Sequence, residues 1–255
     1  MTEQLTVKEI QTRLNDVHST TDPFLNKCTN DGRKGVQNAV KRCLKRLDRI
    51  QKAKAAFQHR FLYENALWQS DNQYVAGIDE VGRGPLAGPV VACAVILDPS
   101  FDLLGVTDSK MLTRHEREQL YLKIVDEAVE VSIGVRSAQE IDRVNVLEAD
   151  KEAMTDAINA LDHHPSHLII DAVKLNNPIP QTTLIKADQK SISVAAASIV
   201  AKEYRDHLMA EYDRLYPQYD FAQNMGYGTK QHLQGLAENG PCPIHRRTFA
   251  PVDRY

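Results

Sequence analysis

One apolar run constrains the fold of this chain more than any other feature. Residues 89–97 read PVVACAVIL, an almost unbroken stretch that is rich in valine. Such a stretch is typical of a strand buried on both faces, because neither set of alternating side chains is suited to water. We therefore expect this segment to lie inside a sheet that is covered by helices.

The order of the other segments predicts the kind of sheet. Apolar segments predict further strands at residues 74–79, 129–135, 168–171 and 183–185, and helical patterns follow from about residue 113 and at 145–161, 191–216 and 229–238. Capping boxes at Thr113 and Ser137 support helix starts there. Strands come early and mostly as neighbours, whereas helices come later. This order predicts an α/β fold with a mixed sheet flanked by helices and a helical C-terminal part.

The first seventy residues differ from the rest of the chain. They contain no strand-like segment, and helical spacing predicts a helix over 36–63, an earlier one over about 6–17 and a break at 19–23. Residues 1–73 contain 13 Lys and Arg against 8 Asp and Glu, whereas the remainder contains 18 against 26. We expect a basic helical N-terminal extension over residues 1–70 and a separate domain over residues 71–255. The basic face of this N-terminal extension, at residues 41–49, either contacts nucleic-acid phosphates or is a solvated helix surface.

Carboxylates follow three of the expected strands. Asp79-Glu80 closes the first strand, Asp171 closes the strand at 168–171, and Asp188 follows the strand at 183–185. A carboxylate at the exit of a buried strand is costly unless it is solvated, hydrogen-bonded or metal-bound, although aspartate there is also a common helix cap or turn former. If the three strand ends share one sheet edge, four carboxylates converge. Divalent cations would then offset their repulsion.

The predicted carboxylate cluster favours a particular chemistry. Hard oxygen ligands select Mg²⁺ or Mn²⁺ over zinc. Two such ions about 3.5–4 Å apart could activate water and stabilise the leaving oxygen in phosphodiester hydrolysis. Because Asp79 and Glu80 are strand neighbours that face opposite sides, both reach one site only if the chain turns there, and Gly82 and Gly84 would permit that turn.

Two glycine-flanked segments could contact nucleic acid. Residues 82–84 read Gly-Arg-Gly, but their spacing misses G-x-G-x-x-G and a strand pattern follows, which disfavours a dinucleotide-binding fold. A turn that lets the backbone approach a sugar fits better. Tyr227 lies between two glycines, where its ring either stacks on a sugar or base or packs into the core.

Several cationic side chains could contact phosphates, although each alone is more simply a solvated surface charge. They are Lys110, Lys186, Lys190, Lys202, Arg246 and Arg247. His232 and His245 are assigned no role in the site, because a satisfied or exposed histidine is the commoner outcome.

Cysteine usage and hydropathy bear on the compartment. The four cysteines lie far apart and include no C-x-x-C pair, which indicates reduced structural thiols rather than a zinc site. No apolar run approaches the roughly 20 residues of a membrane span, and the N-terminus lacks the pattern of a secretory signal. We expect a cytoplasmic protein that does not enter a membrane.

Several ordered segments resemble the type 2 ribonuclease H family, bacterial ribonuclease HII. They are AGIDEVGRGPLAGP at 76–89, TDSK at 107–110, DRVNVLE at 142–148, IID at 169–171, KADQKSISVAAASIVAK at 186–202, GYGTKQH at 226–232 and HRRTF at 245–249. The resemblance runs from about residue 74 to the end of the chain. It implies an RNase H-like fold with a five-stranded mixed sheet. The first seventy residues have no counterpart in the family's minimal form.

The resemblance also implies a reaction. It implies an endonuclease that hydrolyses the RNA strand of RNA/DNA hybrids and incises 5′ of ribonucleotides embedded in duplex DNA. The expected products carry 5′-phosphate and 3′-hydroxyl ends, and the expected process is ribonucleotide excision repair.

The same resemblance implies the site residues. The implied metal-binding and catalytic residues are Asp79, Glu80, Asp171 and Asp188, with two Mg²⁺ or Mn²⁺ ions and Asp79 bridging them. The implied nucleic-acid-binding residues are Gly82, Arg83 and Gly84 at the ribose 2′-hydroxyl, Tyr227 on the sugar beside the cut, and Lys110 at a phosphate.

Two other functions predict different sequence features. Another two-metal nuclease, such as a resolvase or exonuclease, would not need the Gly-Arg-Gly and Gly-Tyr-Gly segments. A catalytically silent nucleic-acid-binding protein would be expected to lack a site carboxylate, yet all four are present. We expect a monomer. No sliding-clamp contact is predicted, because the last residues lack the Gln-x-x-Leu-x-x-aromatic-aromatic tail of some relatives.

Overall fold

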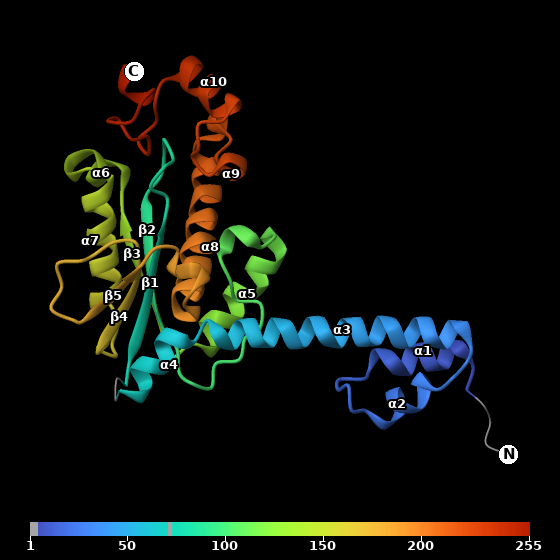
Figure 1. Ribbon diagram of the computed structural model, residues 1–255. Coiled ribbons are helices and arrows are strands. Elements are labelled where there is room, and N and C mark those ends of the chain that lie inside the picture. The colour runs from blue at the N-terminus through green and yellow to red at the C-terminus, as the bar shows by residue number, and fades with distance from the viewer. Residues whose placement is uncertain (1–4, 71–72) are drawn as a thin grey trace. The chain divides into compact units, whose positions relative to one another are not determined.

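The computed structural model describes residues 5–70 and 73–255, and the chain forms two compact units, Met1–His59 and Arg60–Tyr255 (Figure 1). Helix α4 (Leu62–Gln69) belongs to the second unit, so the division lies before the boundary expected near residue 70. No helix in the described part of the chain is long and apolar enough to cross a membrane.

The N-terminal unit contains α1 (Val7–Asn15), α2 (Pro23–Thr29) and α3 (Lys34–His59). α1 begins with a capping box in which the Thr6 hydroxyl accepts from the backbone of Glu9 and the Glu9 carboxylate accepts from the backbone of Thr6. Apolar side chains of all three helices meet in one small core. Tertiary packing therefore stabilises helices that would be marginal in isolation.

The sequence predictions for this region were wrong in two details. The helix expected over 36–63 is interrupted, because α3 ends at His59 and α4 begins at Leu62. The break expected at 19–23 is present up to Asp22, but the helix α2 that follows it was not predicted. The Asp22 carboxylate accepts from the backbone N–H groups of Phe24 and Leu25, and Pro23 stands in the first turn, where its missing donor costs nothing.

A five-stranded mixed sheet organises the described part of the second unit, with strand order β3-β2-β1-β4-β5. The strands are β1 (Val75–Val81), β2 (Val90–Ile96), β3 (Glu130–Arg136), β4 (His167–Asp171) and β5 (Gln181–Leu184). β2 pairs antiparallel with β1 and β3, whereas β1, β4 and β5 run parallel. The valine-rich run is β2, and all its residues are buried. The predicted α/β fold is confirmed.

Helices cover both faces of the sheet (Figure 1). α7 (Val146–Asn159) packs on one face against β2 and β3, and α8 (Ile192–Leu215) packs on the other against β1 and β2. Two glycines permit these contacts. An added Cβ on Gly134 would lie 1.9 Å from the α7 backbone, and one on Gly77 would lie 2.2 Å from the α8 backbone. At these two positions, the backbone of the helix therefore packs directly against the backbone of the sheet.

The remaining elements of this unit flank the sheet or follow α8. They are α5 (Arg114–Glu127), α6 (Ala138–Val144), α9 (Phe221–Asn224), α10 (Lys230–Asn239) and the short 3₁₀ turns η1 (Ser109–Met111), η2 (Ala187–Gln189), η3 (Pro217–Tyr219) and η4 (Val252–Arg254). Both predicted capping boxes are confirmed, at Thr113 for α5 and Ser137 for α6.

The start of α8 is held by a carboxylate from α4. Glu64 is fully buried, and its Oε1 accepts from the backbone N–H of Ser193 at 3.0 Å and from the hydroxyls of Ser191 and Ser193. A carboxylate is stabilised at a helix N-terminus, where backbone donors are free and the helix dipole is positive. α4 thus fixes one end of α8.

Candidate active site

The four predicted carboxylates line one cavity at an edge of the sheet. β1 and β4 run parallel, so their C-terminal ends share an edge. Asp171 Oδ1 accepts from Ala187 N at 2.6 Å, and this contact joins β4 to η2, which carries Asp188. A cavity of about 330 Å³ is lined by Asp79, Glu80, Val81, Ser109, Lys110, Asp171, Asp188, Ser198, Lys202 and Tyr227.

Burial and mutual repulsion raise the pKa of three of these carboxyls. Burial, followed by the charges of Glu80 and Asp171, raises the pKa of Asp79 well above its ordinary value. Burial also raises the pKa of Glu80, with Asp171 adding to the effect and Arg83 opposing it. Burial and neighbouring carboxylates raise the pKa of Asp188. The cavity holds more negative charge than its surroundings neutralise, a setting that favours cations.

The donor chemistry of the cavity suits hard divalent cations. Its acidic donors are carboxylate oxygens, which Mg²⁺ and Mn²⁺ accept readily. Glu80 Oε2 is buried with no hydrogen-bond partner in the described structure, as expected of an oxygen that needs a cation. Within residues 5–70 and 73–255, no three His, Cys, Asp or Glu side chains are arranged as a ready metal-binding set. The carboxylates share a cavity without converging on one point.

Asp79 and Glu80 approach the cavity from opposite faces of β1. The strand stays in register with β2 through Val81, so the two residues are consecutive strand positions. Asp79 is hydrogen-bonded by the Ser198 side chain of α8, whereas Glu80 lies beside Asp150 of α7. Both carboxylates line the cavity without a turn between them.

The chain turns at Gly82, after the strand has ended. Gly82 has a φ of 97°, and an added Cβ would lie 2.4 Å from Arg205 Nε. Both the backbone conformation and the close contact therefore require glycine. The expected turn exists, but it positions Arg83 and Gly84 instead of bringing Asp79 and Glu80 together.

Asp150, a buried acid beside the site, was not predicted from the sequence. Its side chain is 0% exposed, and neither carboxyl oxygen has a hydrogen-bond partner. Arg83 Nε lies 3.7 Å from its Oδ2. Burial, followed by the charge of Glu80, raises the pKa of Asp150 to about 8. The available signal was an aspartate on the same helix face as Ala149 and Ala153, which pack on the sheet.

The two glycine-flanked segments meet beside the carboxylates. The Arg83 side chain is 40% exposed, and its Nη1 lies 3.6 Å from Glu80 Oε1. A Cβ added to Gly84 would lie 3.5 Å from Tyr227 Cε1, so the tyrosine ring lies against the turn. Tyr227 is 49% exposed and lines the cavity. Of the two alternatives for this ring, the structure supports the exposed one.

The cationic candidates separate into two groups. Lys110 and Lys202 line the cavity, and Lys202 Nζ also pairs with Asp206 Oδ1 at 2.7 Å. Lys186, Lys190, Arg246 and Arg247 do not appear in its lining. Arg246 is fully buried, which excludes it as a surface phosphate contact.

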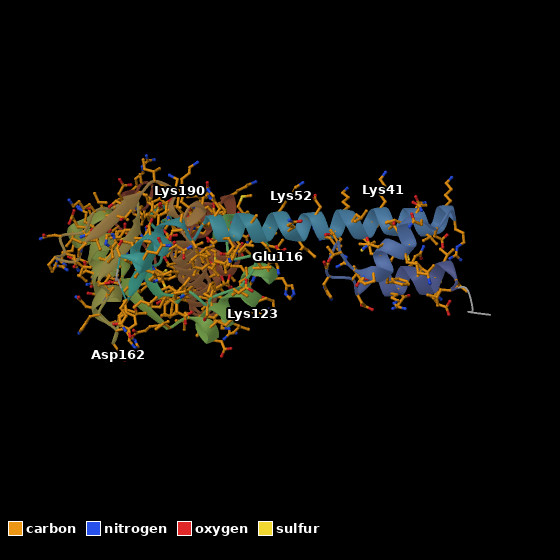
Figure 2. The ribbon with its side chains drawn as sticks, turned by 60° about the horizontal axis from the view of Figure 1, so that its bottom comes forward. Lys41, Lys52, Glu116, Lys123, Asp162 and Lys190 are labelled. Carbon is orange, nitrogen blue, oxygen red and sulfur yellow. The ribbon has the colours of Figure 1, made fainter. Side chains whose placement is uncertain are left out.

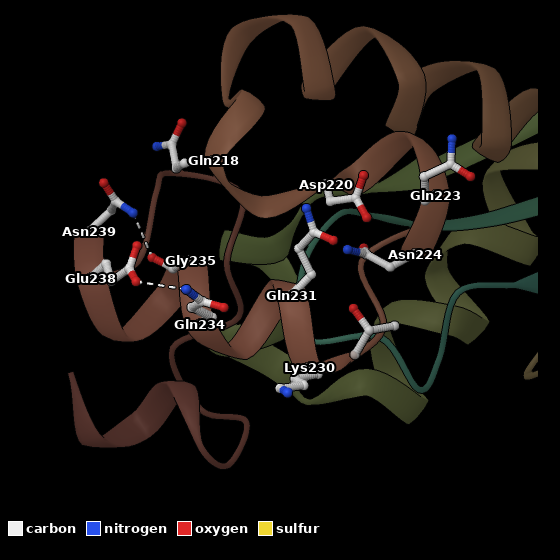
Figure 3. A pocket seen from close by; sticks show the side chains of 11 residues that line it. Gln218, Asp220, Gln223, Asn224, Lys230, Gln231, Gln234, Gly235, Glu238 and Asn239 are labelled. Atoms are coloured by element: carbon white, nitrogen blue, oxygen red, sulfur yellow. Dashed lines mark hydrogen bonds between the residues drawn. The ribbon is translucent and has the colours of Figure 1, made fainter.

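A larger cavity lies in the C-terminal part and contains none of the predicted site residues. Its volume is about 610 Å³, and amide side chains such as Gln223 and Gln231 are prominent in its lining (Figure 3). Gln234 donates to Glu238 along its rim. The smaller cavity is the better candidate for the active site. Carboxyl groups with shifted pKa values are a stronger indication of a functional site than the volume of a cavity.

The chain matches two family models. Ribonuclease HII matches residues 76–252, and the Ribonuclease HII N-terminal domain matches residues 6–68. The chain belongs to the ribonuclease HII family. Relatives named Ribonuclease HII include that of Limosilactobacillus fermentum, 65% identical over 98% of this chain and 97% of that protein, and that of Bacillus licheniformis, 50% identical over 98% of both.

Family membership confirms the resemblance and gives the class of enzyme. The chain is a metal-dependent nuclease, an endoribonuclease of the family that acts on RNA/DNA hybrids. The ribonuclease H2 of Pyrococcus horikoshii has the same fold, with a TM-score of 0.60, 29% identity and coverage of 71% of this chain and 96% of that one. A ribonuclease HIII solved in complex with Mn²⁺, 20% identical with a TM-score of 0.54 over 71% of this chain and 68% of that one, shares the fold.

Proposed function

We propose that this ribonuclease HII family member incises duplex DNA 5′ of an embedded ribonucleotide and cuts the RNA strand of hybrids, leaving 5′-phosphate and 3′-hydroxyl ends. One observation carries the proposal: the four carboxylates line the same cavity as Tyr227, beside the Gly-Arg-Gly turn. Acidic oxygens next to an exposed aromatic ring suit a phosphodiester that is joined to a ribose. Ribonucleotide excision repair is the process in which such an incision would serve.

Asp79, Glu80, Asp171 and Asp188 would hold two Mg²⁺ or Mn²⁺ ions in this proposal. When bound, the ions supply an activated water and stabilise the leaving oxygen. Asp79 would be the central cation ligand of this set, because the charges of Glu80 and Asp171 both act on it and raise its pKa. A cation between these carboxylates would relieve that repulsion.

The two glycine-flanked segments would recognise the ribose. Gly84 is exposed and has no side chain, so its backbone can approach the 2′-hydroxyl, the group that separates RNA from DNA. Gly82 is buried and would contribute by forming the turn that presents Arg83 and Gly84 to the sugar. Arg83 would stand beside that sugar. The ring of Tyr227 would pack on the sugar next to the cut, and Lys110 would contact a phosphate from the cavity lining.

The direct test uses a DNA duplex with a single ribonucleotide and either Mg²⁺ or Mn²⁺. We expect wild-type protein to cut 5′ of the ribonucleotide. Asp79→Asn and Asp171→Asn should slow the cut by about 10²-fold or more, the scale on which groups that stabilise the transition-state charge act. The exposed Asp162 (Figure 2) provides the control, and Asp162→Asn should leave the rate unchanged.

The outcomes separate the alternatives. Cutting of an all-DNA duplex at a similar rate would favour another two-metal nuclease. Tight duplex binding without cutting in either metal would favour a silent binding protein. Undiminished cutting by Asp79→Asn would contradict the assignment of the site.

We also infer that the N-terminal unit contributes to duplex binding. Lys41, Lys45, Arg49 and Lys52 occupy exposed positions of α3, and Figure 2 shows Lys41 and Lys52 extending from the helix. Arg46 has a different role, because its Nη2 donates to the carbonyl oxygens of Leu14 and Val17 at the end of α1. The alternative is a solvated helix face without a ligand.

Charge removal in the full chain distinguishes these two roles. Replacing Lys41, Lys45 and Arg49 by Gln should weaken duplex binding and reduce the slope of log K against log salt by about 0.9 per lost phosphate contact. Lys8→Gln with Lys27→Gln, at exposed positions of the same unit, is the control. An unchanged slope in the triple variant would leave the solvated face as the explanation.

We propose that the protein acts as a monomer, since Asp79, Glu80, Asp171 and Asp188 of one chain reach the same cavity. All four cysteines are buried free thiols, which supports the reducing cytoplasm as the compartment. Size-exclusion chromatography coupled to light scattering, run with and without duplex, tests the monomer: we expect one chain per particle.

A further inference from the structure

The guanidinium of Arg246 is buried beneath the Gly-Arg-Gly turn. Arg246 is 0% exposed, and its side chain donates to Arg83 O at 2.9 Å, to Gly82 O, and to Gly88 O at 3.0 and 2.9 Å. Burial lowers the pKa of Arg246 to about 9. Burying this charge is costly, and the cost is offset only while these carbonyl groups keep their positions around it.

Its neighbour His245 is joined to the Tyr227 loop through a second histidine. Cys242 N donates to His245 Nδ1 at 3.0 Å, His245 Nε2 lies 2.9 Å from His232 Nε2, and His232 Nδ1 lies 2.9 Å from Tyr227 O. A backbone N–H only donates and a carbonyl only accepts. One pair of neutral tautomers therefore satisfies all three hydrogen bonds in this series, with His245 Nε2 and His232 Nδ1 carrying the protons.

Backbone contacts place this C-terminal segment between the two loops. His245 forms a bridge with Ala87, Arg246 N donates to Leu86 O at 2.9 Å, and Leu86 N donates to Gly226 O at 2.8 Å. Gly226 is pressed against the same strand-like segment, since an added Cβ would lie 2.3 Å from Ala87 O. Arg246 thus contacts the Gly-Arg-Gly turn directly, and its neighbour His245 contacts the Tyr227 loop through His232.

We propose that His245 and Arg246 are positioning residues that hold the Gly-Arg-Gly turn and the Tyr227 ring at a fixed separation, and that they thereby determine how strongly the enzyme prefers a ribonucleotide at a junction with DNA. The inference rests on the proposed reading of the ribose by these loops. The carboxylates are held separately, by β1, β4 and η2. Loss of the two contacts should therefore change selectivity more than the cutting step itself.

Arg246→Lys tests the contact with the turn. A lysine ammonium keeps the charge but cannot reproduce the fork that spans three carbonyl groups. Cutting is compared on two duplexes that differ only in carrying a 2′-hydroxyl or a 2′-fluoro group at one position. We expect the wild-type preference for the hydroxyl to fall at least tenfold, since displacements near 1 Å can cost about 10²-fold. Arg247→Lys, the same change at the exposed neighbouring position, should keep the preference.

His245→Asn tests the contact with the tyrosine loop. The asparagine oxygen can replace Nδ1 as acceptor for Cys242 N, but nothing reaches His232. The preference for a single embedded ribonucleotide over an all-RNA hybrid should fall several-fold. In a Tyr227→Ala background the same substitution should have no further effect, because the positioned ring is absent. A general loss of stability would persist in that background.

The results decide between positioning and simple packing. If both preferences stay at wild-type values while kcat/KM falls equally on every substrate, the positioning role is wrong. If Arg246→Lys fails to fold by circular dichroism, the His245 and Tyr227 cycle decides alone. Wild-type protein that cuts none of the duplexes would instead contradict the proposed function.

Discussion

Replacing Asp150 by Asn should stabilise the metal-free protein, and more strongly at pH 7 than at pH 5. Burial and the charge of Glu80 raise the pKa of Asp150 from 3.8 to about 8 in the folded chain. Between these values the unfolded chain has released the proton that the folded chain still holds. The free energy of unfolding therefore falls as pH rises through this window. Asparagine is close to isosteric with the protonated acid and does not titrate, so it removes this dependence.

The size of the effect follows from the shift. Each pH unit inside the window changes the stability by about 1.4 kcal/mol, so two units between pH 5 and pH 7 correspond to about 3 kcal/mol. The side chain is 0% exposed, and solvent screening therefore does not reduce this figure. The difference in unfolding free energy between Asp150→Asn and wild type should widen by this amount over the two units.

Urea unfolding in EDTA at pH 5 and pH 7, followed by circular dichroism, measures the difference. EDTA removes cations that would change the charge balance around Glu80. Glu148→Gln, at an exposed carboxyl of the same helix, is the control and should stay within about 0.5 kcal/mol of wild type at both pH values. A gap between Asp150→Asn and wild type that is equal at both pH values would refute the reasoning, because Asp150 would then be ionised in the folded chain.

Two further predictions concern the sheet and the tyrosine loop. Gly77→Ala should lower the free energy of unfolding by about 1–3 kcal/mol, since its Cβ would lie 2.2 Å from the α8 backbone, whereas Gly32→Ala meets nothing within 4 Å and should be silent in thermal melts. Tyr227→Ala should slow incision at a single ribonucleotide by about 10-fold or more while Tyr227→Phe keeps most of the rate, because stacking on an aromatic ring contributes about 1–3 kcal/mol. Equal rates for both tyrosine variants in single-turnover assays would remove the ring from substrate binding.

The sheet was predictable because its strands carry strong local signals. The run at β2 has no polar position, and the ends of β1 and β4 carry acids where apolar segments stop. The capping boxes at Thr113 and Ser137 fixed two helix starts, since their side-chain spacing alone defines the motif. α2 escaped prediction because seven residues are too few to show a helical period.

The carboxylate candidates were predictable for the same reason, but their supports were not. Asp171 is the last residue of β4, and Asp79 lies two residues before the end of β1, so the predicted strand ends are close to the observed ones. Asp150, Arg205 and Arg246 are charged residues that the fold buries against distant segments. Arg246 meets the carbonyl groups of residues more than 150 positions earlier in the chain, and no local pattern encodes such a contact. Charged residues are usually exposed, so a single sequence favours the wrong environment for all three.

The Glu64 contact with α8 bears on how proteins of this kind could be recombined. Residue 64 falls within the match to the N-terminal family model, at 6–68, yet its carboxylate serves the first turn of a helix inside the catalytic match, at 76–252. A chimera joined between the two matches would exchange the partner of Ser191 and Ser193 together with the N-terminal unit. A chimera joined at His59 instead takes Glu64, Ser191 and Ser193 from the same parent protein. The better junction for domain exchange therefore lies upstream of the boundary between the two family matches.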